Sequence, residues 1–184
     1  MTVTVDAMPL AGLVELVNGW GTVPREARAE DGGEEAYPPI AAQAGVPPEA
    51  AGVLTDQAMA HIADRLHPIF ATSGAAEQVR LVNELLAETG VRPILSMEED
   101  QPRLGWIVGG GKDAVLAAGA VALRQYLADH RSDRLGVCTG RRCADVYIDT
   151  SPAGRRRFCS LTCQNRARVA AFRSRRARSG SSRT

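Results

Sequence analysis

The spacing of the four cysteines constrains the fold of this chain more than any other feature. All four lie near the C-terminus, in the pattern Cys138-x4-Cys143-x15-Cys159-x3-Cys163. Two close pairs joined by a linker of this length are typical of a site in which four thiolates surround one zinc ion. Because four sulfur ligands leave no open coordination position, the predicted zinc ion is structural. An iron–sulfur cluster and four unliganded thiols are the alternatives.

The N-terminus bears on whether the cysteines form disulfides instead. It lacks the positive start, continuous apolar core and small-residue cleavage site of a secretory signal. No stretch of the sequence has the run of apolar residues that is needed to span a bilayer. We therefore expect a cytoplasmic protein without a membrane segment. Thiols stay reduced in the cytoplasm, which favours a metal site over disulfides.

Charge divides the chain into two parts of opposite sign. From Met1 to His130 there are 8 basic and 18 acidic side chains, a net charge of −10. From Arg131 to Thr184 there are 14 arginines and 3 acidic side chains, a net charge of +11. A segment this basic has the electrostatics of a polyanion binder, because each phosphate that it neutralises releases a condensed counterion. It is equally suited to dock on the acidic half.

The sequence around the cysteines predicts a small module of the treble-clef type. Cys138 and Cys143 would lie on a knuckle, followed by a strand at Val146–Ile148, a turn and a returning strand at Arg155–Phe158. Ser160 can cap a helix that carries the last cysteine in its first turn. A segment this short can hardly bury enough core to fold alone, so the metal must supply much of its stability.

The rest of the chain predicts a mainly helical domain with a β-hairpin and a core rich in alanine, leucine and valine, so the fold class is α+β. A long loop is expected at Gly21–Pro48. The expected helices are Leu10–Val17, Pro48–Phe70 with Thr55 or Asp56 as cap, Ala75–Thr89 capped by Ser73, and Ala114–Asp129 capped by Asp113. The expected hairpin strands are Arg92–Ser96 and Leu104–Val108.

Three regions follow from these elements and from the charge reversal. Residues 1–130 form an acidic sensory or interaction domain, and residues 131–178 form the zinc finger with its basic helix. Arg131–Gly136 is expected to link the two. The Arg/Ser/Gly content after Arg173 points to disorder, with residues 179–184 as a disordered tail.

The residues around the second cysteine pair resemble a known family. Arg156-Arg157-Phe158-Cys159-Ser160-x-x-Cys163-Gln164-Asn165-Arg166 is similar to the CGNR zinc finger, which has an Arg-Trp/Phe-Cys-Ser lead-in and a Cys-Gly-Asn-Arg signature. Proteins with this finger usually carry an N-terminal ABATE domain and belong to a group of proposed stress-induced transcription regulators. The resemblance implies an ABATE-like domain here as well. Gln164 stands where the signature has glycine.

The basic residues near the metal site suggest how the module would bind DNA. Asn165, Arg166 and Arg168 lie early in the predicted helix, where Asn suits adenine and Arg suits guanine. RNA is less favoured, because few aromatic residues are available for stacking on bases. Phe172 is expected to pack with Val169 in the core of the finger. The candidate nucleic-acid-binding residues are Arg155, Arg156, Arg157, Gln164, Asn165, Arg166, Arg168, Arg173, Arg175 and Arg176.

Two further readings remain open from the sequence. The finger could be a protein-interaction module that docks to an acidic partner or to its own N-terminal domain. The N-terminal domain could respond to a small-molecule or protein signal, with Asn18, Trp20 and Trp106 as candidate lining of a pocket. An enzymatic role is not expected, because this domain has no cysteine and no Gly-x-Ser-x-Gly nucleophile motif. The oligomeric state stays open, and a homodimer is compatible with the sequence.

Overall fold

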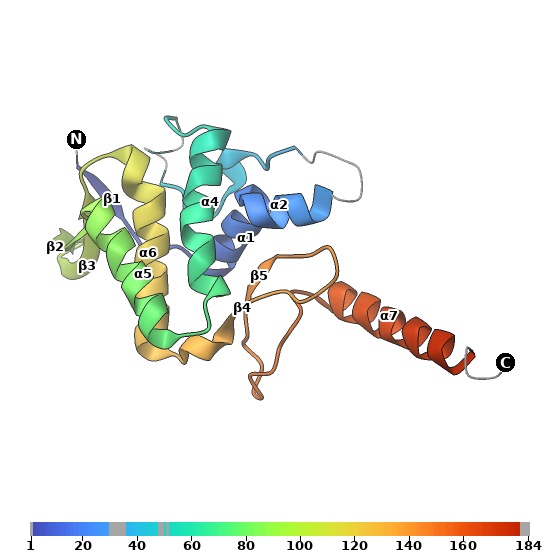
Figure 1. Cartoon of the computed structure of the whole chain (residues 1–184). Helices are drawn as coiled ribbons and strands as arrows, with labels where there is room; N and C mark the ends of the chain where they lie inside the picture. The colour runs from blue at the N-terminus through green and yellow to red at the C-terminus, as the bar shows by residue number, and fades with distance from the viewer. Residues whose placement is uncertain (1, 30–35, 48–49, 51, 181–184) are drawn as a thin grey trace.

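The computed structural model describes residues 2–29, 36–47, 50 and 52–180. It has the expected α+β class: helices pack beside a small sheet, and α7 extends away on the opposite side (Figure 1). The elements are β1 Val3–Val5, α1 Leu10–Trp20, α2 Thr22–Ala29, the 3-10 helix η1 Ile40–Ala42, α4 Asp56–Ala71, α5 Ala75–Thr89, β2 Arg92–Glu98, β3 Gln101–Val108, α6 Gly111–Asp129, the 3-10 helix η2 Ser132–Arg134, β4 Leu135–Val137, β5 Val146–Ile148 and α7 Leu161–Gly180.

Helix α6 forms the centre of the core. All of its residues from Ala114 to Leu123 are buried, and most of them are alanine or valine. The small side chains let neighbouring helices approach closely: a Cβ added at Gly119 would lie 3.1 Å from Leu66 on α4. The prediction of an alanine-rich helical core is therefore confirmed.

The sheet has one strand more than expected. Its order is β1-β3-β2, with antiparallel neighbours. The predicted β2–β3 hairpin is confirmed, although both strands are longer than predicted and meet at a two-residue turn. Glu99 and Asp100 make this turn with φ values of 47° and 61°, as the type I′ turn of a tight hairpin requires. Strand β1 was not predicted, because three residues are too few to show a period.

Helix α2 lies inside the segment that the sequence predicts as a loop. Its first residue, Thr22, donates to both carboxylate oxygens of Asp64, from its backbone N at 2.7 Å and from its Oγ1 at 2.6 Å. The start of the helix is thus stabilised by a residue from α4, so no local capping pattern reveals it. Residues 30–35 and 48 of the predicted loop lie outside the described residues.

The other helices follow the predictions with local differences. Helix α1 continues past Val17 to Trp20, and α5 has the predicted bounds and ends at Gly90 in the left-handed conformation. Thr55 caps α4 as expected, with its Oγ1 accepting from the N of Ala58 at 3.2 Å. The first residues of the helix predicted from Pro48, residues 48–49 and 51, lie outside the described residues.

Two of the predicted N-caps are wrong. The N-cap residues of α5 and α6 are Gly74 and Gly110 and not the predicted Ser73 and Asp113. On α5, Val79 faces solvent, while Gln78 is buried and its Nε2 donates to the carbonyls of Ile69, Thr72 and Ser132. The side chain of Gln78 thus connects α5 to the end of α4 and to η2.

The zinc-finger region is packed against the helical domain. Leu135 of β4 and Val146 of β5 are buried within the same hydrophobic cluster as α1, α4 and α6. The segment predicted as a linker, Arg131–Gly136, is accordingly the 3-10 helix η2 and the start of β4. Helix α7 reaches Gly180, past the expected start of the tail at Ser179, and residues 181–184 lie outside the described residues. Across the described part of the chain, no helix is long and apolar enough to cross a membrane.

Candidate metal centre and nucleic-acid interface

The four cysteines come together at one point, as their spacing predicts. Their Sγ atoms all lie within 4.8 Å of one another, and the distances from Cys159 to Cys143 and to Cys163 are 3.6 and 3.7 Å. Four sulfurs around one zinc ion, with Zn–S bonds of about 2.3 Å, would be separated by about 3.8 Å. The thiols are not paired as disulfides. The cluster therefore fits one structural zinc ion with four sulfur ligands.

The first cysteine pair lies on a knuckle that connects β4 to β5. The N of Cys138 donates to the carbonyl of Asp145 at 2.8 Å, and the N of Cys143 donates to that of Gly140 at 3.2 Å. A Cβ added at Gly140 would lie 3.2 Å from the Sγ of Cys138, so the glycine leaves room for the sulfurs. Within this knuckle, Arg142 has a left-handed backbone conformation, with a φ of 58°.

The second pair brackets the start of α7. Ser160 caps the helix as predicted: its Oγ accepts from the N of Cys163 at 3.2 Å, and its carbonyl accepts from the N of Gln164 at 3.1 Å. Cys163 therefore lies in the first helical turn, where the positive end of the helix dipole favours a thiolate.

The protonation of the thiols couples zinc binding to proton release. Burial raises the pKa of the Cys143 thiol, and burial also raises the pKa of Cys159 to about 12. Zinc binds the thiolate form. Zinc must therefore displace protons from these two cysteines, as metal binding to cysteine commonly does.

The predicted returning strand at Arg155–Phe158 is wrong. Strand β5 pairs with β4, upstream of the knuckle, in the register Leu135 to Ile148. Residues 155–158 have no regular structure. They are held by Thr139, which donates from its N and Oγ1 to the carbonyl of Arg157 at 2.9 and 3.0 Å. Side-chain hydrogen bonds of Asp149 and Tyr147 with the backbone of Arg156 also hold this segment, which therefore needs no strand partner.

Asp149 organises the turn that follows β5. Its carboxylate accepts from the N of Ser151 and from the N of Arg156, each at 2.8 Å. Burial works to raise the pKa of Asp149, but these hydrogen bonds and the charge of Arg134 outweigh it and hold the pKa below its usual range. The carboxylate is therefore ionised at neutral pH.

Arg156 is part of the scaffold of the finger. Its guanidinium donates to the carbonyl of Phe158 at 2.8 Å, to that of Ile148 at 3.4 Å and to that of Cys159. It also lies 5.2 Å from the centre of the Tyr147 ring, and the Tyr147 hydroxyl donates to the carbonyl of Arg156 at 2.6 Å. Three of its five N–H donors are thus used within the finger, and the predicted phosphate contact of Arg156 stays a prediction.

Replacing Arg156 by Lys is expected to lower the free energy of unfolding by about 1–2 kcal/mol, because an ammonium cannot reproduce the fork of donors. A urea titration of the zinc-loaded protein measures this change. Arg157→Lys is the matched control, since among the described residues the Arg157 side chain makes no hydrogen bond or ion pair, and its change should stay within about 0.5 kcal/mol. Equal effects of the two variants would contradict the scaffold role.

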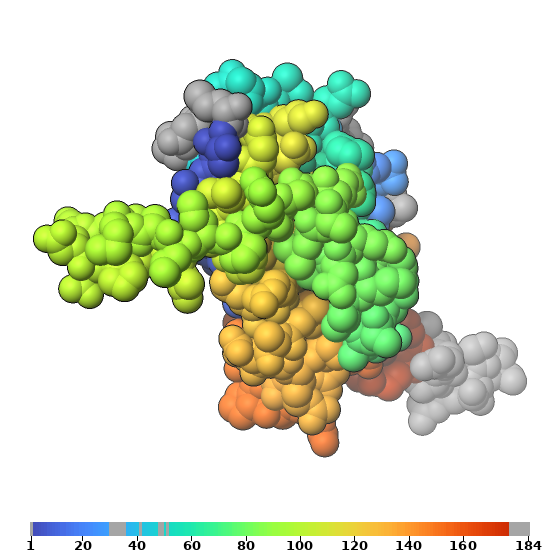
Figure 2. Space-filling view, turned by 90° about the vertical axis from the view of Figure 1, so that its left-hand side faces the viewer, coloured from blue at the N-terminus to red at the C-terminus, as the bar shows by residue number. Residues whose placement is uncertain are grey.

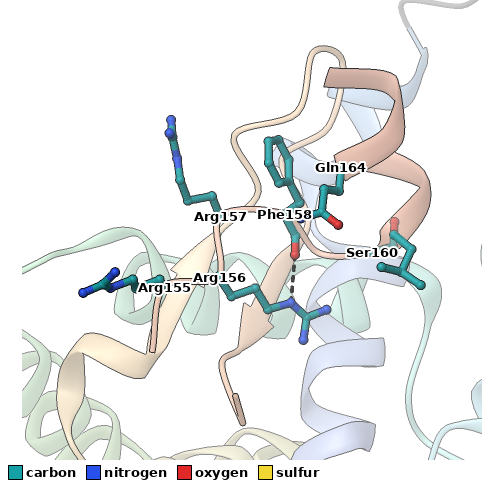
Figure 3. A pocket seen from close by; sticks show the side chains of 7 residues that line it. Arg155, Arg156, Arg157, Phe158, Ser160 and Gln164 are labelled. Atoms are coloured by element: carbon teal, nitrogen blue, oxygen red, sulfur yellow. Dashed lines mark hydrogen bonds between the residues drawn. The ribbon is translucent and has the colours of Figure 1, made fainter. Parts of the chain in front are cut away.

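Arg155 and Arg157 lie on either side of Arg156 and point in different directions, into solvent (Figure 3). With Arg156, Phe158, Ser160, Leu161 and Gln164 they line a cavity of about 440 Å³ at the start of α7. Gln164 lies beside Phe158, so its amide faces this cavity (Figure 3). The cavity combines exposed guanidinium groups with the N-terminal end of a helix, and both attract anions.

Beyond its first two turns, α7 projects from the finger with every described side chain from Arg168 to Arg176 exposed. Phe172 and Val169 are 53% and 50% exposed, so the prediction that they pack in the core of the finger is wrong. The helix is longer than the small finger can cover. Arg176 instead stacks over the ring of Phe172, at 5.8 Å from its centre.

Most of the predicted contact residues line neighbouring surfaces of this exposed helix. Asn165, Arg166 and Arg173 border one shallow cavity, together with Val169. Arg168, Arg173 and Arg176 border another one around Phe172. Arg175 is also exposed on the helix. Asn165 and Arg166, the predicted base-reading residues, thus lie with several arginines on adjoining faces of α7. Arg155 and Arg157 line a different cavity, at the start of the helix.

The three predicted pocket residues do not form one site. Asn18 and Trp20 border a cavity of about 450 Å³ between α1, α2 and the η1 segment, and Trp106 is not part of its lining. Trp106 lies on β3 with the guanidinium of Arg124 at 5.4 Å from a ring centre. Trp20 is buried in the core.

Asn18 has a role that the sequence does not reveal. Its side chain donates to the carbonyl of Val146 at 3.1 Å and accepts from the N of Val146 at 2.7 Å. Beside it, Arg28 donates to Asp145 at 2.7 Å and to the carbonyl of Asn18 at 2.7 Å. The contacts to Val146 and Asp145 join residues more than 100 positions apart, so only the folded structure identifies them. They attach α1 and α2 to the finger beside the zinc ligand Cys143.

Comparison with known proteins assigns the C-terminal part of the chain. A search of curated proteins found no match. The family model of the CGNR zinc finger matches residues 134–176, a segment that contains β4, β5, all four cysteines and most of α7. The ABATE-like character of the N-terminal domain stays a prediction. Residues 134–176 thus carry a zinc finger of the CGNR type, with one structural zinc ion at its four cysteines.

Proposed function

We propose that the protein is a DNA-binding transcription regulator whose zinc finger presents α7 to the duplex. The observation that carries this proposal is the exposure of α7: a helix of 20 residues, rich in arginine, starts at the zinc site and extends into solvent. Such a helix is about 30 Å long, and a helix fits the major groove of B-DNA. The zinc site would hold its first turn rigid.

The proposed contacts divide by their position on the finger. Asn165 and Arg166, close to the zinc site, would read base edges. Arg168, Arg173, Arg175 and Arg176, farther along α7, would contact phosphates, as would Arg155 and Arg157 at the start of the helix. Gln164 faces the cavity beside these two arginines, so the residue that replaces the signature glycine would add an amide donor for a phosphate or a base.

The alternative is a protein-interaction module that docks to an acidic partner or to the helical domain. The finger does pack against the helical domain, but through β4 and β5. The ion pair in that contact joins a basic residue of the helical domain, Arg28, to an acidic residue of the finger, Asp145. Attraction between the acidic half and the arginines of α7 therefore does not explain this packing. The exposure of α7 argues against docking of its arginines to the helical domain and leaves them open to an external polyanion.

The proposed role is regulatory and involves no catalytic step. The proposal places the protein in the cytoplasm, where thiolate ligands stay reduced. The cavity between α1 and α2 is a candidate site for a signal, because its lining residues Asn18 and Arg28 also contact the finger. A stress-related role rests on the family resemblance alone.

We expect zinc-loaded protein to bind duplex DNA with an affinity that falls steeply as salt rises. Fluorescence anisotropy with labelled duplexes between 50 and 200 mM salt measures the slope, to which each phosphate contact contributes about one unit. The triple variant Arg168→Gln, Arg173→Gln and Arg176→Gln should reduce the slope by about three units.

Arg80→Gln is the control for this measurement, because Arg80 is an exposed arginine on α5, outside the finger. Its slope should equal that of the unmodified protein. Binding that is absent, or that does not respond to salt, would overturn the proposed function. Selection of bound sequences from a random DNA pool then tests whether Asn165 and Arg166 confer specificity.

A further inference from the structure

The β2–β3 hairpin extends beyond the body of the protein as an arm. Strand β1 pairs only with Trp106, Ile107 and Val108 of β3, so the outer part of the hairpin, residues 94–105, consists of two strands alone. Figure 2 shows this part, in yellow-green, standing away from the helices. Two-stranded hairpins are marginally stable in water, and a third strand or a packed face is needed to stabilise them. We call residues 94–105 the hairpin arm.

One face of the hairpin arm is apolar and exposed. Leu95 pairs with Leu104, and Met97 pairs with Pro102, so the four side chains share a face. Leu95, Met97 and Leu104 are 65%, 68% and 87% exposed. Contiguous exposed apolar side chains on a protein surface mark an interaction site.

The edge of β2 is also open for pairing. In the hairpin, Pro93 pairs with Trp106 and Pro102 pairs with Met97. Proline has no N–H, so both fit at pairs that do not exchange hydrogen bonds. Leu95 and Met97 follow Pro93 by two and four positions, so they too belong to pairs that exchange no hydrogen bonds with β3. Their backbone N–H and C=O groups therefore point away from β3. Strand β2 thus offers a set of backbone donors and acceptors at the edge of the sheet.

Strand β2 is complementary to a second copy of itself. In an antiparallel pairing centred on Leu95, Arg92 of one copy lies opposite Glu98 of the other, and the two-fold axis repeats this pair. Both side chains lie on the face opposite to Leu95. The edge of β3 is less suited to such pairing, because β1 already covers its residues Trp106, Ile107 and Val108.

We propose that two copies of this chain pair through the β2 edges of their hairpin arms and form a two-fold symmetric dimer with a continuous six-stranded sheet. The N–H and C=O groups of Leu95 pair with those of Leu95 in the other copy, and the Met97 N–H of each copy donates to the Pro93 carbonyl of the other. On the apolar face, Leu95 lies against Leu95 of the other copy and Met97 lies against Pro93 of the other copy. Two Arg92–Glu98 pairs fix the register. The net charge of +1 per copy gives little long-range repulsion. The proposal does not depend on DNA binding.

Sedimentation equilibrium of the zinc-loaded, nucleic-acid-free chain tests the dimer. Arg92→Glu and Glu98→Arg place like charges opposite each other and should each weaken the dimer about tenfold, while the double variant restores the pairs and the affinity. Arg103→Gln is the control: it removes the partner of Glu98 within the same chain, at 3.2 Å, and should leave the dimer intact. Circular dichroism checks that each variant is folded.

A cross-link fixes the position of the two-fold axis. In the proposed register the two Leu95 Cα atoms are about 5.5 Å apart, a separation that a disulfide can bridge. Leu95→Cys should therefore form a disulfide-linked dimer under mild oxidation, and Leu104→Cys, one strand farther from the axis, should not. A monomer at every concentration, failure of the double charge variant to restore dimerisation, or equal cross-linking at both positions would each overturn the proposal.

Discussion

Removing zinc is expected to unfold the finger and to weaken the helical domain with it. In isolated zinc-finger peptides the metal contributes about 10–16 kcal/mol of apparent binding free energy, and here the finger's own sheet is a single pairing of two three-residue strands, β4 and β5. Leu135 and Val146 belong to the core shared with α1, α4 and α6. Unfolding of the finger therefore exposes part of that core. We expect the midpoint of thermal unfolding to fall by about 10 °C or more.

Amide hydrogen exchange with and without a chelator locates the effect. Protection in residues 134–165 should be lost, and protection in α1 and α4 where they contact β4 and β5 should decrease. Re-addition of zinc should restore both, and the variant Cys159→Ser with Cys163→Ser should behave like the chelated protein without recovery. Unchanged exchange in α1 and α4 would show that the finger and the helical domain fold independently.

Much of the metal site could be predicted because its signals are local. The two cysteine pairs, the strand Val146–Ile148 and the cap at Ser160 each depend on a few neighbouring residues. Close ligand pairs form within one turn of the chain, so their spacing is visible in the sequence. The same holds for α5, whose bounds follow from its apolar period and from Gly90.

The errors arise where a distant residue supplies the stabilising contact. Helix α2 depends on Asp64 and was predicted as loop. The scaffold role of Arg156 escapes the sequence for a similar reason, because its three backbone carbonyl partners meet at the guanidinium only in the folded finger. The predicted packing of Phe172 assumed a finger large enough to cover α7. No local pattern distinguishes these cases.

Asn18 is the contact whose loss should most weaken the attachment of the finger. Its side chain pairs with both the N–H and the C=O of Val146, a residue that is fully buried. In Asn18→Ala these two groups would lose their partners, and an unsatisfied buried group costs about 1–3 kcal/mol. We expect the free energy of unfolding to fall by about 2–4 kcal/mol, as measured by urea titration of the zinc-loaded protein.

Two further variants separate the hydrogen bonds of Asn18 from other effects. Asn18→Asp keeps the acceptor for the N of Val146 but places a carboxylate oxygen against its carbonyl, so it should remain strongly destabilised even though the shape is conserved. Asn83→Ala, at an exposed position of α5, should change the free energy of unfolding by less than about 0.5 kcal/mol. Zinc content should stay at one ion per chain in all three variants, because Asn18 is not a ligand. If Asn18→Ala is as stable as Asn83→Ala, the finger is held by the packing of Leu135 and Val146 alone.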